Sequence, residues 1–126
     1  MSKIAILRSA KNARRCPLTN CLRCLAGARE GFAGYDDPEP AGIFTLDPDP
    51  EENLQLARIL KSKGAEAIHV TTCAFAKKGE GGWVLGDGLE KDLDLEGLLK
   101  RMAQDTGLPC VLGTAHLPEG YQPLRF

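Results

Sequence analysis

The chain has 126 residues, of which 43% are hydrophobic and 26% are charged, and its formal net charge is −1. This length suits a single domain spanning residues 1–126, since a fold commonly takes ~150 residues, and the near-neutral charge argues against a nucleic-acid partner. No apolar run approaches the roughly 20 residues that cross a bilayer and no signal peptide is recognisable, so we expect a cytoplasmic protein without a membrane partner.

Short apolar runs alternate with longer amphipathic segments along the chain, which predicts alternating strands and helices. In chain order we expect a strand at 3–7, a helix at 19–30, a strand at 41–46, a helix from Pro50 to the residue before Gly64, a strand at 65–72, a helix from Leu95 to the residue before Gly107, and a strand at 108–114. A glycine-rich segment, residues 77–88, predicts tight turns and a short hairpin-like excursion between the third strand and the last helix.

The two longer helices carry their own boundary signals. Asp49 is a suitable cap for the helix that begins at Pro50, and its expected inner face includes Leu56, Ile59 and Leu60. The last helix is capped by Asp92 or Asp94, and its apolar residues recur at helical spacing: Leu95, Leu98, Leu99, Met102 and Ala103.

This alternation predicts an α/β fold of three layers, α/β/α, with a mainly parallel sheet of about four strands in the order 2-1-3-4. It would be flavodoxin-like or Rossmann-like, although the chain lacks the glycine fingerprints that bind nucleotides. In such sheets ligands collect at the carboxyl ends of the strands. The loops at that edge are residues 9–16, 47–49, 73–87 and 115–119.

Soft metal-binding donors lie in three of those loops. Cys16 follows the first strand, Cys73 the third and His116 the fourth, so the topology predicts that they meet at one edge of the sheet. Cys16, Cys21 and Cys24 form a C-x4-C-x2-C run that also occurs in plant-type ferredoxins. An iron–sulfur cluster is the weaker interpretation, because ferredoxin clusters of that type sit on a different architecture and buried core thiols explain Cys21 and Cys24 more simply.

Two further residues have alternative roles. His69 lies within the third strand, where it is either a core histidine with hydrogen-bond partners or a metal ligand. Trp83, in the glycine-rich segment, either forms part of a lid over the carboxyl edge or packs that segment against the body.

Several segments together resemble the CGGC-domain family of small bacterial and archaeal proteins. They are residues 4–8, the region of Cys16 and Cys21, and residues 31–35, 42–45, 63–73 and 113–116. The resemblance implies metal binding, with zinc as the expected ion. The chain departs from the family at the position of the Cys-Gly-Gly-Cys motif, which Leu46, Asp47, Pro48 and Asp49 occupy.

The remaining soft donors lead to three hypotheses. The first is a metal site formed by Cys16, Cys73 and His116, with Cys21 or His69 as the fourth ligand and Asp47 or Asp49 as replacement oxygen donors. The second is a metal-free thiol enzyme, redox or nucleophilic, that uses Cys16 with His116. The third is a non-catalytic binding or regulatory module whose cysteines are structural. Across these hypotheses the expected partner is a metal ion or a small ligand that the sequence does not identify.

Overall fold

The computed structural model describes residues 2–126, and its centre is a five-stranded sheet in the order β2-β1-β3-β6-β7. Strands β1 (Ser2–Arg8), β2 (Pro38–Thr45), β3 (Ala67–Val70) and β6 (Cys110–Leu112) are parallel, and β7 (Leu124–Arg125) pairs antiparallel with β6. The predicted order of the parallel strands and the α/β/α fold are confirmed. The strand β7 was not predicted, and it extends the sheet by one strand.

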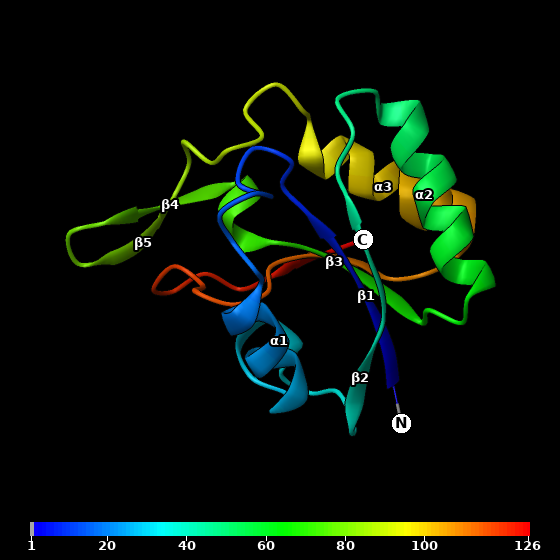
Figure 1. Cartoon of the computed structure of the whole chain (residues 1–126), viewed down its shortest axis with the longest axis horizontal. Helices are drawn as coiled ribbons and strands as arrows, with labels where there is room; N and C mark the ends of the chain where they lie inside the picture. The colour runs from blue at the N-terminus through cyan, green and yellow to red at the C-terminus, as the bar shows by residue number, and fades with distance from the viewer. Residues whose placement is uncertain (1) are drawn as a thin grey trace.

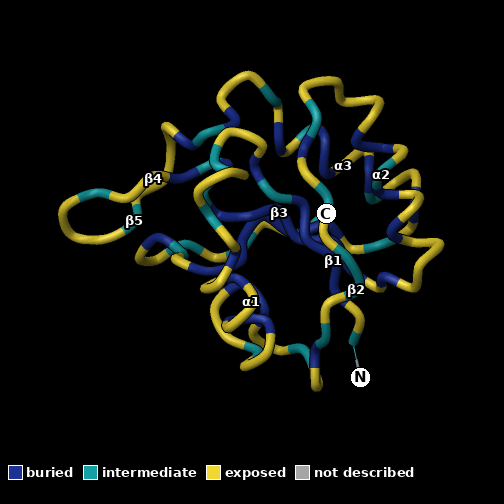
Figure 2. The backbone as a smooth tube through the Cα atoms, viewed as in Figure 1, coloured by how far each residue is buried: buried dark blue, intermediate teal, exposed yellow. Residues whose placement is uncertain are grey.

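Helices cover both faces of the sheet (Figure 1). Helix α1 (Thr19–Ala26) and the short 3-10 helix η1 (Glu30–Phe32) pack on one face, and α2 (Pro50–Ser62) and α3 (Leu95–Thr106) pack on the other. The alternation of side chains along β1 explains both interfaces: Ile4 and Ile6 face α1, while the residues between and after them face α2 and α3. Figure 2 shows these central strands as the buried part of the chain.

The predicted boundaries of α2 and α3 are confirmed by their caps. Asp49 accepts a hydrogen bond from the backbone N–H of Glu51, and Asp94 accepts one from that of Gly97. Gly107 ends α3 with a φ of 74°, a left-handed conformation that glycine adopts at little cost.

Three local predictions were wrong. The helix expected over 19–30 ends at Ala26, because the chain turns at Gly27 and enters η1. Ile59 of α2 is 43% exposed, whereas Leu60 is buried as predicted, together with Asn53, Leu54 and Ala57. The strand expected at 41–46 begins earlier, at Pro38, since an edge strand tolerates proline.

The glycine-rich segment forms the predicted hairpin. Strands β4 (Ala76–Gly79) and β5 (Gly82–Leu85) pair antiparallel and project from the body of the protein (Figure 1). They follow the 3-10 helix η2 (Thr72–Ala74), which begins shortly after β3 ends. Within residues 2–126, no helix has the length and hydropathy that a bilayer-spanning segment requires.

Candidate functional site

A pocket of about 250 Å³ lies at the carboxyl edge of the sheet, against the amino end of α1. Four of the five predicted ligands line it: Cys16, Cys21, Cys73 and His116. They come from the β1–α1 connection, α1, η2 and the segment after β6. The prediction that these distant segments meet at one edge of the sheet agrees with this arrangement.

Hydrogen bonds to backbone carbonyls hold the segment that carries Cys16. The Arg8 guanidinium, at the end of β1, donates to the carbonyls of Cys16 and Ala13, and the backbone N–H of Cys16 donates to the Asn12 carbonyl over 2.9 Å. The Arg8 cation is therefore engaged within the β1–α1 connection. These bonds fold residues 12–16 back, so that Cys16 lines the pocket just before α1 begins.

Cys73 lies on η2 and has two polar neighbours. Its thiol donates to Thr71 Oγ1 over 3.3 Å, and the amide nitrogen of Asn12 donates to its sulfur over 3.5 Å. Cys73 is half-buried, so its sulfur is reachable from the pocket.

Cys21 lies deeper than Cys73 and shares a hydrogen bond of 3.2 Å with Thr114 Oγ1. Burial raises the pKa of the Cys21 thiol, partly offset by the bonds to Thr114 and the Ala115 backbone, and charge on Cys73 or Cys16 raises it further. The three sulfurs therefore interact electrostatically. An uncompensated thiolate on Cys21 is disfavoured, and a nearby cation would reverse that preference.

His116 is held over the pocket by its neighbours. Its ring stacks on Trp83 of β5 with a centroid distance of 5.1 Å and an interplanar angle of 11°, and the Asn20 amide nitrogen lies 3.0 Å from Nε2. Its backbone N–H donates to Glu30 over 3.2 Å. Because an amide N–H can only donate, Nε2 accepts this bond and Nδ1 carries the ring proton.

Two non-glycine residues that line the pocket adopt the left-handed backbone conformation. Leu18 has a φ of 65° and His116 a φ of 56°. This conformation costs about 1–2 kcal/mol for a non-glycine residue, and such strain concentrates at ligand sites. The surrounding hydrogen bonds of Glu30 and Asn20 hold His116 in this conformation.

The fifth predicted ligand, His69, does not line the pocket. It is buried in β3, where Nδ1 lies 2.8 Å from the Gly113 carbonyl and Nε2 lies 2.8 Å from the Tyr35 hydroxyl. Only a ring N–H can bond to a carbonyl, so Nδ1 donates and Nε2 accepts from Tyr35. Burial lowers the pKa of His69 to about 4, and the imidazole is neutral with both nitrogens engaged. These contacts are those of a core histidine.

The carboxylates that could have replaced the missing cysteines also lie elsewhere. Asp47 accepts from the backbone N–H of Asp49 over 2.8 Å, and Asp49 caps α2. The Asn53 side chain bonds to both the N–H and the carbonyl of Asp47. Both carboxylates thus stabilise the turn between β2 and α2, and neither lines the pocket.

The donors share the pocket without converging on one point. Over residues 2–126, no three His, Cys, Asp or Glu side chains are close enough together to hold a metal ion as they stand. The present hydrogen-bond partners of Cys21, Cys73 and His116 are neutral groups.

Sequence reasoning missed the polar residues that orient the donors. They are Asn12, Asn20, Glu30, Thr71 and Thr114, which contact Cys73, His116 or Cys21. The threonines carried a usable signal, since each lies at the carboxyl end of a predicted strand. The contact between Asn20 and His116 joins residues 96 positions apart and has no local signature.

Comparison with known proteins identifies one family. The family model described as CGGC domain matches residues 3–115, which includes every residue named in this pocket except His116. Comparisons with curated proteins and with solved structures gave no match.

Proposed function

This chain belongs to the CGGC-domain family, and from that premise we propose that it binds a thiophilic metal ion, with zinc as the first candidate. Cys16, Cys21 and Cys73 would supply thiolates, and His116 would supply an imidazole. One observation carries the proposal: four soft donors from four separate segments line a single pocket. Thiolates and imidazole together favour zinc over hard cations such as magnesium, which prefer oxygen donors.

The donor set also indicates the kind of site. Three thiolates and one imidazole fill the four positions that zinc takes in structural sites, so no position remains for a water molecule. A bound ion would join the β1–α1 connection, α1, η2 and the segment after β6. Binding would release thiol protons, and the pKa of Cys21, raised by burial, makes this release easier at higher pH.

We expect protein purified without an affinity tag to hold zinc in a one-to-one ratio by elemental analysis. Cys16→Ser, Cys73→Ser and His116→Ala should each weaken zinc binding by at least about a hundredfold, because removing a ligand costs more than removing its outer hydrogen bonds. Competition with a chromophoric chelator measures this affinity.

The matched control is Cys110→Ala. Cys110 is buried on the opposite face of the sheet, and burial raises its pKa to about 12. This variant loses a thiol and should keep zinc affinity unchanged. Absence of zinc from the wild-type protein, together with no uptake on titration, would refute the proposal.

The metal-free thiol enzyme is the second candidate, supported by the mutual electrostatic influence of the three sulfurs in one pocket. In protein treated with a chelator we expect iodoacetamide to modify Cys16 and Cys73 first. Both are half-buried, whereas Cys21, Cys24 and Cys110 are buried and have raised pKa values.

Peptide mapping by mass spectrometry gives the order of modification. Equal rates at Cys16 and Cys110 would contradict the expected order. Fast modification of Cys16 below neutral pH that is lost in His116→Ala would favour thiol chemistry over metal binding. Inert thiols without metal would leave the third hypothesis, a binding module with structural cysteines.

A further inference from the structure

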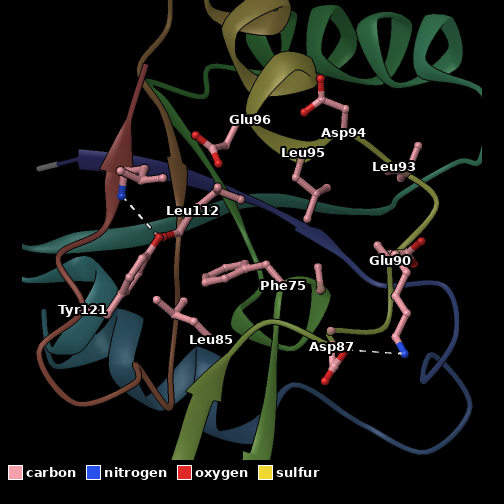
Figure 3. Close-up of a pocket in the computed structure, with 14 residues that line it drawn as sticks. Phe75, Leu85, Asp87, Glu90, Leu93, Asp94, Leu95, Glu96, Leu112 and Tyr121 are labelled. Atoms are coloured by element: carbon pink, nitrogen blue, oxygen red, sulfur yellow. Dashed lines mark hydrogen bonds and ion pairs between the residues drawn. The ribbon is translucent and has the colours of Figure 1, made fainter.

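A second and larger hollow, of about 620 Å³, lies on the side of the sheet that α3 covers. It is bounded by the amino end of α3, the base of the hairpin and the segment that leads into β7 (Figure 3). It shares no lining residue with the thiol pocket, the one that Cys16, Cys21, Cys73 and His116 line. Its volume lies in the range of pockets that hold small organic molecules, about 300–1,000 Å³.

Aromatic and aliphatic side chains form the floor of this groove. The rings of Phe75 and Tyr121 lie 5.5 Å apart between centroids with an interplanar angle of 43°. The Tyr121 hydroxyl donates to the Leu112 carbonyl over 2.8 Å and accepts from the backbone N–H of Leu124, so the ring is fixed. At the rim, Leu85 is 57% exposed and Leu124 is 41% exposed. A ligand seated here would cover apolar surface that water now contacts.

Four carboxylates and one ammonium group also line the groove. Three of the carboxylates have partners: Asp87 pairs with Lys77 and Lys91, Glu90 accepts from the Ser9 hydroxyl, and Asp94 caps α3. Within residues 2–126 no ion pair engages the fourth, Glu96. Its carboxylate points from α3 into the groove (Figure 3). Burial is the main cause that raises the pKa of Tyr121, and the charge of Glu96 raises it further. Glu96 and Tyr121 both line the groove.

We propose that this groove binds a small organic cation with an aromatic or aliphatic body. The body would lie on Phe75, Leu85 and the Tyr121 ring, and the cationic group would lie beside the Glu96 carboxylate. A carboxylate beside aromatic rings attracts a cation twice, by its charge and by the electron-rich ring faces. The excess of carboxylates at the groove disfavours anionic ligands of the same shape.

Three probes of one shape test this proposal on the full chain: naphthylmethylammonium, the neutral naphthylmethanol and the anionic naphthoate. Titration followed by amide NMR should shift the signals of Phe75, Leu85, Glu96 and Tyr121 with the cation. We expect the cation to bind about fivefold more tightly than the alcohol, as one ion pair at a surface groove contributes up to ~1 kcal/mol. Naphthoate should bind more weakly than either.

Glu96→Gln should reduce the affinity for the cation by about twofold to fivefold and leave that for the alcohol unchanged. Glu66→Gln is the matched control, because Glu66 is exposed at the amino end of β3, outside the groove, and its loss changes net charge equally. Equal affinity for the cation and the anion would overturn the proposal. So would shifts confined to the thiol pocket, or groove signals that change on dilution without a probe, since a second copy would then cover the groove.

Discussion

Gly31→Ala is expected to destabilise the protein by about 3 kcal/mol, because the added methyl group meets backbone and not a flexible side chain. A Cβ at Gly31 would lie 2.5 Å from the Gly113 carbonyl oxygen and 2.8 Å from the Thr114 nitrogen. The backbone N–H of Gly31 also donates to the Thr114 carbonyl over 2.9 Å, so η1 cannot move away without losing that bond. We expect the melting temperature to fall by on the order of 10 °C.

Gly81→Ala is the matched control for this substitution. A Cβ at Gly81, in the hairpin turn, meets no heavy atom within 4 Å. Its unfolding free energy should stay within about 0.5 kcal/mol of wild type, since surface substitutions of this kind have small effects. Thermal unfolding followed by circular dichroism compares the two variants. Wild-type stability of Gly31→Ala would contradict the close approach of η1 to the segment after β6.

The protein is expected to lose stability in acid because unfolding exposes His69 to protonation. Its pKa falls from an ordinary value of 6.5 to about 4, because burial disfavours the imidazolium ion. Below pH 6.5 the unfolded chain binds a proton that the folded chain does not, so stability should fall as pH drops toward about 4. The full loss from this one residue is about 3 kcal/mol. Above pH 6.5 both states are neutral and the contribution is constant.

Urea unfolding across this pH range, for wild type and His69→Gln, tests the assignment. The variant should be less stable at neutral pH, since it loses ring packing against Phe32, whose centroid lies 4.6 Å away. Its stability should nevertheless change less with pH than that of wild type. Phe32→Leu is the control, because it loses the same ring packing and keeps the imidazole, so its stability should change with pH as that of wild type does. An unchanged slope in His69→Gln would assign acid unfolding to other groups.

Helices α2 and α3 were predictable because their signals are local. Caps at Asp49 and Asp94 and the left-handed Gly107 are set by residues within one turn of the helix end. The outward position of Ile59 was not predictable in this way, since the phase of the α2 face depends on where α3 packs against it. Likewise β7 has two residues and exists only through pairing with β6.

The candidate site, like the fold, was predictable only in part. Parallel strands and one-handed crossovers bring the ends of β1, β3 and β6 to one edge, and this rule placed Cys16, Cys73 and His116 near each other. The rule could not choose between Cys21 and His69 as the fourth donor. Cys21 lies in the pocket because α1 starts there, whereas His69 is engaged by Tyr35 and Gly113.

The sequence by itself determined the family, the order of the elements and the three segments whose donors meet at the carboxyl edge, since these follow from short-range pattern and from chain topology. Tertiary structure alone decided the contacts that orient the donors, such as Asn20 with His116 and Thr114 with Cys21. It alone also formed the groove beneath Glu96. These depend on side chains far apart in the chain, whose distances are fixed only when the sheet and both helix layers pack together.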